Sequence, residues 1–299
     1  MIKYRSIEQL VAAAEEKQCR ISDIVLEQQA SQLEKSKEEI YHMMKINLDV
    51  MKESVAHGLN KDLRSSSGLT GGDAYKMKQA VDQEKNICGK LFGNAMVKAL
   101  SVSETNSCMG KIVSAPTAGS CGVIPAALLT IMEERNIEEE AVVMGLILAS
   151  GFGMVIANLA SISGAEGGCQ AEVGSASAMA AAALTEIAGG TPRMAAHACA
   201  IALKNLLGLV CDPVAGLVEI PCVKRNAMGV ANAFVAAELS LAGIESAIPV
   251  DEVIIAMKKV GDSLPHTLKE TAEGGLADTP TGRKLCAKVF GGNCSSCNK

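Results

Sequence analysis

The stretch AVVMGLILASGFGMVIANLASISGA, residues 141–165, carries no charged side chain. Its 25 residues are long enough to span a bilayer. However, Gly151, Gly153 and Asn158 interrupt the stretch, and neither aromatic anchors nor a cluster of Lys and Arg flanks it. The mean hydropathy of the whole chain, +0.23, is also close to flat. We therefore expect a helix that is buried on all sides in a large core, and no association with a membrane.

Two further segments share this low charge and extend the same core. Residues 175–188 read SASAMAAAALTEIA, and a helix over 192–207 is expected to begin at Thr191-Pro192. Hydrophobic residues make up 48% of the chain, but it has only three Tyr, four Phe and no Trp, so aliphatic side chains must fill the interior. No alternation of period two is sustained over a normal strand length. The sequence predicts an all-α fold: a large helical domain with Ala/Gly-rich helices buried at its centre.

The outer helices are predicted from capping residues and apolar spacing. Ser6 opens a capping box before a helix over 6–18. A long helix, broken at most once, is expected from Ser22 to about His57, with Gly58 as its C′ residue and His42 and His57 exposed on it. Further helices are expected over residues 74–100, 223–242, 249–261 and 279–292. In the helix over 74–100, the apolar side chains available for the core are Val81, Ile87, Leu91, Met96 and Val97.

Nothing in the chain has the composition of a linker. We therefore expect one domain over residues 1–299, with N-terminal helices over 1–60, a core over 61–290 and a cysteine-containing tail over 291–299. The net charge of −5 and the aromatic content of 2% provide neither a basic surface nor a stacking platform, which argues against nucleic acid as a partner. The N-terminus meets polar and acidic residues too early for a signal peptide, so we expect a cytoplasmic protein.

Eleven cysteines in such a chain are expected to be reduced thiols or metal ligands. Most should be ordinary core residues, because a free cysteine among apolar neighbours behaves as a small hydrophobe. This expectation covers Cys88, Cys108, Cys121, Cys199 and Cys286. Cys294 and Cys297 form a CxxC in the tail, but no second pair is present to complete a zinc knuckle.

Three other cysteines lie in loops that follow the apolar helices. Cys211 and Cys222 belong to GLVCDPVAGLVEIPCVKRN, residues 208–226, where prolines and a glycine favour an irregular loop. Cys169 follows a glycine pair that allows a close backbone approach. The three thiols form a candidate soft-metal site with one coordination position left open. Their spacing is weak support by itself, because none lies in a compact CxxCxxC run, and core cysteines remain the alternative.

Two turns are candidate anion sites. LRSSSGLTGGDAYKM, residues 63–77, is a Ser/Gly turn that leads into a helix at Asp73, where backbone N–H groups and the helix dipole favour a carboxylate or phosphate. In SAPTAGSCGVIPAALL, residues 114–129, Thr117 and Ser120 resemble a second such turn. Plain capped loops are an equal alternative for both. The Gly-Lys-Ser/Thr of a P-loop is missing, which argues against a nucleotide.

Several long segments resemble those of a known family. They are SSSGLTGGDA (65–74), SAPTAGSCGVIPAALL (114–129), GAEGGCQAEVGSASAMAAAAL (164–184), LGLVCDPVAGLVEIPCVKRNAMG (207–229) and GGLADTPTGRKLC (274–286). In these motifs the chain resembles the iron–sulfur-dependent L-serine dehydratases, in particular their catalytic, or alpha, part. The likeness extends from about residue 60 to 290.

The resemblance implies a cofactor, a partner and a reaction. It implies that Cys169, Cys211 and Cys222 hold a [4Fe-4S] cluster, that no pyridoxal phosphate is used, and that a separate beta subunit exists. It also implies conversion of L-serine to pyruvate and ammonia, with a C-terminal cysteine in some members reaching the cluster. Substrate binding would fall to two loops, through Ser67, Gly68, Thr70 and Gly71 and through Thr117, Ala118, Gly119 and Ser120. The catalytic base is assigned to Ser66 or Ser67, unless the partner chain supplies it.

Three other functions are weighed against this one. A pyridoxal-phosphate dehydratase would catalyse the same net reaction, but it normally has an α/β fold, which the helical pattern contradicts. An L-cysteine desulfidase of the same cluster type would release thiolate in place of hydroxide, and the motifs do not separate the two. A non-enzymatic iron–sulfur scaffold remains as a candidate from a different class.

Overall fold

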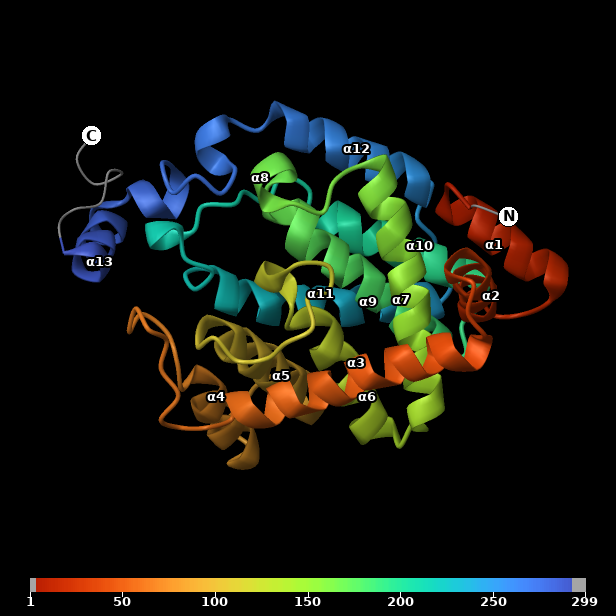
Figure 1. The fold of residues 1–299 in the computed structure, drawn as a ribbon, viewed down its shortest axis with the longest axis horizontal. Coiled ribbons are helices and arrows are strands. Elements are labelled where there is room, and N and C mark those ends of the chain that lie inside the picture. The colour runs from red at the N-terminus through yellow and green to blue at the C-terminus, as the bar shows by residue number, and fades with distance from the viewer. Residues whose placement is uncertain (1–3, 292–299) are drawn as a thin grey trace.

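The computed structural model describes residues 4–291, and the helices in this part are joined without any strand. The all-α prediction is therefore confirmed for the described residues. The α-helices are α1 (Ile7–Lys17), α2 (Ile21–Leu33), α3 (Lys37–Gly58), α4 (Asp73–Asp82), α5 (Gly89–Ser107), α6 (Val123–Arg135), α7 (Glu139–Leu159), α8 (Gly164–Gly167), α9 (Ser175–Ile187), α10 (Pro192–Asn205), α11 (Cys222–Leu241), α12 (Val250–Ser263) and α13 (Pro280–Phe290) (Figure 1). Short 3₁₀ turns include η1 (Ala118–Ser120) and η3 (Val214–Gly216), and η2 (Gln170–Gly174) is a π-helix.

Helix α9 occupies the centre of the molecule. It packs against α6, α7, α10 and α11, and every residue from Ser175 to Thr185 is buried. Its alanines allow this, because small side chains let four neighbouring helices approach closely on all sides. Figure 1 shows α12 and α3 passing on opposite sides of this centre, with α13 at one end of the molecule.

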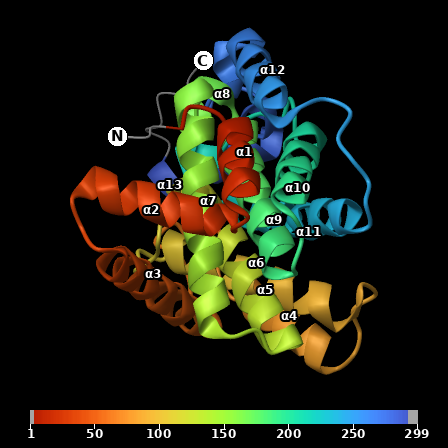
Figure 2. The same ribbon diagram turned by 90° about the vertical axis from the view of Figure 1, so that its right-hand side faces the viewer.

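Helix α7 is the buried helix expected from the uncharged stretch. It packs against α2 and α3 on one side and against α9 on the other (Figure 2). Among the described residues it alone passes the length and composition test for crossing a membrane, yet 72% of its most apolar window is buried inside the protein. It ends at Leu159, six residues before the predicted end, where the Ser161 hydroxyl accepts a hydrogen bond from the Ser163 amide and starts a turn.

The N-terminal helices follow their predicted caps with one correction. Ser6 caps α1 by accepting from the Gln9 amide, and the long segment breaks once, where Glu34 adopts a left-handed conformation (φ 54°). His42 and His57 are exposed. Gly58, however, is not the C′ residue: it is the last helical residue of α3, and a Cβ there would lie 2.0 Å from the Ser101 carbonyl oxygen. Its role is a close crossing with α5.

The prediction of one continuous helix over 74–100 is wrong. The structure has two helices there, α4 and α5, joined by residues 83–88. In this connection the Asn86 side chain donates to the Gly89 carbonyl, and Glu84 adopts a left-handed conformation (φ 53°). Ile87 therefore lies outside the core and is 100% exposed. Cys88 is exposed and Cys108 is half-buried, which corrects their assignment as core residues. Cys121, Cys199 and Cys286 are buried as expected.

The C-terminal helices appear where the sequence predicts them, with shifted ends. Helix α12 continues to Ser263, and Gly261 lies inside it, where it packs closely against Gly167. Thr279 caps α13, which packs against η3 in the loop between Cys211 and Cys222. Cys294 and Cys297 lie outside the described residues.

Candidate active site

The three loop cysteines lie at the same end of the central helices. Cys169 immediately precedes η2 and α9, Cys211 follows the C-terminal end of α10, and Cys222 is the first residue of α11. All three are buried. Burial is the largest cause of the raised pKa of Cys211, and the nearby charges of Glu172, Cys169 and Cys222 raise this pKa further. The fold thus brings together cysteines that are up to 53 residues apart in sequence.

Backbone contacts between the two cysteine loops explain this convergence. The Gln170 amide donates to the Leu209 carbonyl (2.9 Å), and the Gln170 side chain accepts from the Gly208 amide (3.0 Å). Gly168 has a φ of 76°, and a Cβ on it would lie 2.9 Å from the Leu209 oxygen. A side chain at residue 168 would therefore be strained and would push the two loops apart.

The donor set fits a thiolate-ligated group. Burial raises the pKa of Cys169 to about 11 and that of Cys222 to about 12, so the bare thiols are protonated at neutral pH and a bound cationic centre would deprotonate them. The positive charge of Arg225 acts in the opposite direction on the pKa of Cys169. A Cβ on Gly164 would lie 3.0 Å from the Cys211 sulfur, so a glycine keeps this space open.

The arrangement of candidate ligands can be compared with that of a single-ion site. Between residues 4 and 291, no three His, Cys, Asp or Glu side chains are arranged to hold one metal ion. A four-iron cluster binds each thiolate at a different iron and so spreads its ligands over a wider space.

Two residues of α11 connect the cysteine loop to its surroundings. The buried Asn226 side chain donates to the carbonyls of Cys222 (2.9 Å) and Gly119 (2.8 Å) and accepts from the Gly122 amide (2.9 Å). The next residue toward the N-terminus, Arg225, donates to the Val210 carbonyl and to the Asp212 carboxylate. Helix α11 thus fixes the position of Cys222 relative to η1.

The predicted Thr117–Ser120 turn lies beside the cysteines. The Thr117 hydroxyl donates to the carboxylate of Glu172 (2.7 Å), whose other oxygen lies 3.9 Å from the Cys211 sulfur. Burial raises the pKa of this carboxyl, and the Thr117 hydrogen bond acts in the opposite direction. Ala118 is exposed, Ser120 is buried, and a Cβ on Gly119 would lie 3.1 Å from a Glu172 oxygen.

The predicted serine loop is organised by another carboxylate. Glu219 accepts hydrogen bonds from the hydroxyls of Ser65 (2.7 Å), Ser67 (2.7 Å) and Thr70 (2.6 Å). Ser66 and Gly68 are exposed, and Gly71 packs closely against the Leu63 carbonyl. Since Glu219 lies three residues before Cys222, it connects the serine loop directly to the cysteine loop.

The amides at the start of α4 already have an acceptor. Glu104, from α5, is fully buried and accepts from the amides of Asp73 (2.8 Å) and Ala74 (3.2 Å). The chemistry predicted for this helix N-terminus, an anion held by backbone N–H groups, is present, but the anion is a side chain of the protein. The serine loop can therefore offer its hydroxyls to a ligand, but not these amides.

Sequence reasoning did not identify Glu104, Glu172 or Glu219. Glu172 and Glu219 lie within the same motif segments as the cysteines, each as the one charged residue of a shorter run, residues 167–185 and 213–223. A lone carboxylate in such a run is expected to be buried, and a buried carboxylate is a functional candidate.

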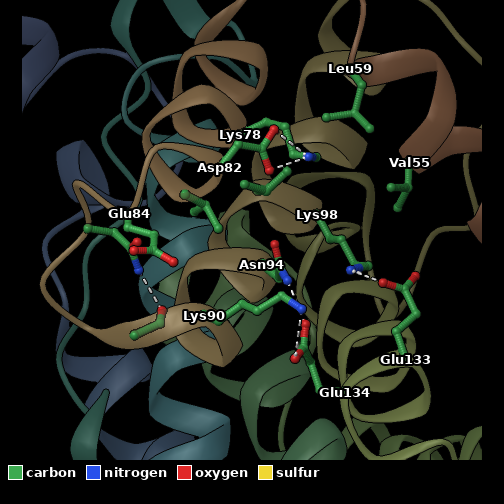
Figure 3. A pocket seen from close by; sticks show the side chains of 14 residues that line it. Val55, Leu59, Lys78, Asp82, Glu84, Lys90, Asn94, Lys98, Glu133 and Glu134 are labelled. Carbon is green, nitrogen blue, oxygen red and sulfur yellow. Dashed lines mark hydrogen bonds and ion pairs between the residues drawn. The ribbon is translucent and has the colours of Figure 1, made fainter.

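The cavity drawn in Figure 3 lies away from these residues. It measures about 810 Å³ and is formed by α3, α4, α5 and α6 and the segments that follow α3 and α4. Lys78, Lys90 and Lys98 line it, and each pairs with a carboxylate that also lines it. None of the predicted site residues borders this cavity.

Comparisons with known proteins agree with the resemblance found in the motifs. A sequence model of the family described as "Serine dehydratase alpha chain" matches residues 16–277. The chain is 53% identical over 293 residues to the probable L-serine dehydratase, alpha chain, of Bacillus subtilis, covering 98% of this chain and 97% of that protein. It is 46% identical over 277 residues to the L-serine dehydratase, alpha chain, of Peptoniphilus asaccharolyticus, covering 93% and 95%.

A third relative is a longer protein. The L-serine dehydratase TdcG of Escherichia coli is 43% identical over 181 residues, which cover 60% of this chain and 40% of that protein. The matches to the two alpha chains extend over nearly the whole length of both partners. We conclude that the chain belongs to the serine dehydratase alpha chain family.

Proposed function

We propose that the chain is the catalytic subunit of a cytoplasmic L-serine dehydratase that converts L-serine to pyruvate and ammonia. The cofactor would be a [4Fe-4S] cluster held by Cys169, Cys211 and Cys222. The observation that supports this proposal most directly is the convergence of three buried thiols with two hydroxyl-bearing turns, each held by a buried carboxylate. The names of the relatives supply the substrate.

The chain's own residues would bind and orient the substrate. When bound, the cluster would supply a Lewis-acidic iron with an open coordination position. The Thr117–Ser120 turn and the Ser67–Gly71 loop would hold the carboxylate and ammonium groups of L-serine against the cysteine site. Loss of the Cα proton and of the β-hydroxyl as water gives an enamine, which tautomerises and hydrolyses to pyruvate and ammonia.

The two candidate base residues differ in their surroundings. Ser67 is half-buried and hydrogen-bonded to Glu219, whereas Ser66 is exposed at the surface of the loop. Ser67 is therefore the better placed of the two to contact the substrate, and a residue from a partner chain is the alternative source of the base.

A separate beta subunit is also proposed. Two relatives are named as alpha chains, and the longer Escherichia coli relative contains more chain than this one matches. A second chain would supply that remaining part. Co-purification of a second protein at a fixed ratio, lost when its gene is deleted, is the expected result.

Anaerobic purification and one pair of variants test the cluster proposal. We expect the protein to show the broad visible absorption of an iron–sulfur cluster, and we expect Cys211→Ser to lose both this absorption and pyruvate formation. Cys199→Ser is the matched control, because Cys199 is equally buried but lies in α10, away from the site, so it should retain both. A colourless protein with full activity would contradict the cluster proposal.

A substrate comparison separates the remaining alternatives. Pyruvate release is measured with L-serine, L-threonine and L-cysteine, and L-serine is expected to be preferred. Preference for L-cysteine would indicate a desulfidase instead. A coloured protein that releases pyruvate from none of the three would indicate a non-enzymatic scaffold.

A further inference from the structure

Glu219 is a buried carboxylate that has only neutral partners. Its side chain accepts from three hydroxyls, those of Ser65, Ser67 and Thr70. No Lys, Arg or His side chain in residues 4–291 forms an ion pair with it. The hydroxyls satisfy its hydrogen-bonding capacity in part, but they leave its negative charge without a countercharge, and burying an unpaired charge is unfavourable.

The negative charges of two other buried carboxylates are compensated, whereas that of Glu219 is not. Asp212 forms an ion pair with Arg225 (2.9 Å). Glu104 lies at the N-terminus of α4, where the helix dipole and two backbone amides balance its charge. Glu219 has no cation, and although α11 begins three residues after it, no amide of that helix donates to its carboxylate, which accepts only from the three hydroxyls.

The carboxylate lies close to an open surface. Ser67, which donates to it, is half-buried, and the flanking Ser66 and Gly68 are exposed. A Cβ on Gly68 would meet no atom within 4 Å. Cys222 is the third residue after Glu219, so their Cα atoms are at most about 11 Å apart. Glu219 therefore joins the serine loop, through its side chain, to the segment that carries the proposed cluster ligand, through its backbone.

The direction of the hydrogen bonds indicates which group the loop would receive. Each hydroxyl that donates its proton to Glu219 can only accept from other partners, as Ser67 does from the Leu69 amide (3.0 Å) and Ser65 from the Thr70 amide (3.4 Å). A loop that presents a negative charge and lone pairs attracts a cationic donor and repels a carboxylate. Of the charged groups of L-serine, only the ammonium fits this description.

We propose that Glu219 is the counter-ion of the α-ammonium group of the substrate, and that Ser65, Ser67 and Thr70 hold its carboxylate in position before the substrate binds. This inference rests on the proposed function, because it takes L-serine as the substrate. Of the two charged groups of L-serine, it assigns the ammonium to the serine loop.

The test compares L-serine with 3-hydroxypropionate, which keeps the carboxylate and the β-hydroxyl but has hydrogen in place of the ammonium. The enzyme is the full chain, loaded with its cofactor and purified without oxygen together with the second subunit. KM for L-serine and the inhibition constant for 3-hydroxypropionate are measured for the wild type, Glu219→Gln, Glu172→Gln and Glu104→Gln. Visible absorption and the thermal unfolding midpoint of each variant report cofactor content and folding.

We expect Glu219→Gln to raise KM for L-serine roughly 30-fold or more, which is the effect of removing one partner of a buried charge pair. Inhibition by 3-hydroxypropionate should be nearly unchanged, because this compound has no group for Glu219 to pair with. Glu104→Gln is the matched buried control, and any effect it has should be the same for both compounds.

Several outcomes would overturn the assignment. In the first, Glu219→Gln changes KM for L-serine and the inhibition constant for 3-hydroxypropionate by the same factor. In the second, it changes neither constant. In the third, Glu172→Gln and not Glu219→Gln raises KM for L-serine selectively. If Glu219→Gln does not fold, Glu219→Asp, which keeps the charge, must retain the preference for L-serine.

Calorimetric titration of both compounds separates this inference from the proposed function. If the wild type releases no pyruvate, the proposed function fails. The counter-ion role is then still decided by binding: the wild type must bind L-serine more tightly than 3-hydroxypropionate, and Glu219→Gln must lose that difference.

Discussion

Glu104 shows how one side chain can hold a loop in place. Its buried carboxylate accepts from the Asp73 and Ala74 amides, so Glu104→Ala would leave two donors unsatisfied at the start of α4. We expect a loss of about 2–4 kcal/mol in the free energy of unfolding, measured with urea. Glu53→Ala, at an exposed position on α3, is the control and should change stability by less than about 0.5 kcal/mol. Equal effects of the two substitutions would contradict the capping role.

Glu186 provides a pH-dependence prediction at a residue far from the cysteines. Burial of its carboxylate, which accepts from the Ser22 amide, raises its pKa above the ordinary value of about 4.3. The folded state therefore binds more protons than the unfolded state between that value and the raised one, and stability falls as pH rises through this window.

Glu186→Gln removes this titration. As pH increases from about 5 to 8, the wild type should therefore lose unfolding free energy relative to Glu186→Gln, so the variant becomes the more stable of the two by a growing margin or the less stable by a shrinking one. Urea unfolding of both proteins across this range measures the difference, in which the titrations of all other groups cancel. A difference that does not depend on pH, or that moves toward the wild type, would show that the carboxylate does not titrate as described.

The crossing of α3 and α5 depends on one glycine. Alanine is the better helix former by about 1 kcal/mol, so Gly58→Ala would be stabilising if the helix were isolated. In the fold, a Cβ at Gly58 would overlap the backbone of Ser101, and we expect a net loss of about 1–3 kcal/mol in unfolding free energy. Ala56→Gly, at an exposed position on the same helix, measures propensity alone. A Gly58→Ala protein as stable as the wild type would mean that the helices do not approach this closely.

The helix boundaries show which structural signals can be read from neighbouring residues and which cannot. Thr191-Pro192 and Thr279-Pro280 start α10 and α13 as predicted, because a cap and a proline act within one turn of helix. The break between α4 and α5 was missed, since it depends on a turn held by the Asn86 side chain and no proline marks it. Ile87 was placed in the core by its hydrophobicity alone and is fully exposed.

The whole molecule is built around α9, with α7 buried against it. Since most of the apolar surface of α7 already faces protein, we expect the chain to stay in the supernatant when lysate is centrifuged at high speed without detergent. Release only by detergent would contradict the burial of α7.

Sequence alone determined the helical class, most of the helix starts, the buried central helices and the segments that contain the three cysteines. These features follow from local propensity, capping and the distribution of charge, all of which act over a few residues. The motifs also carried the family resemblance. The assignment of Cys169, Cys211 and Cys222 as ligands, and of the serine and threonine loops as substrate-binding, stays a prediction.

The tertiary structure decided which groups meet. Glu219 lies 149 to 154 residues from the hydroxyls that it accepts from, and Glu172 is 55 residues from Thr117. Such pairs depend on the path of the chain through the whole core, and no local pattern encodes that path. For this reason the sequence could indicate two loops suited to an anion, while only the fold revealed that buried carboxylates of the protein already organise both of them.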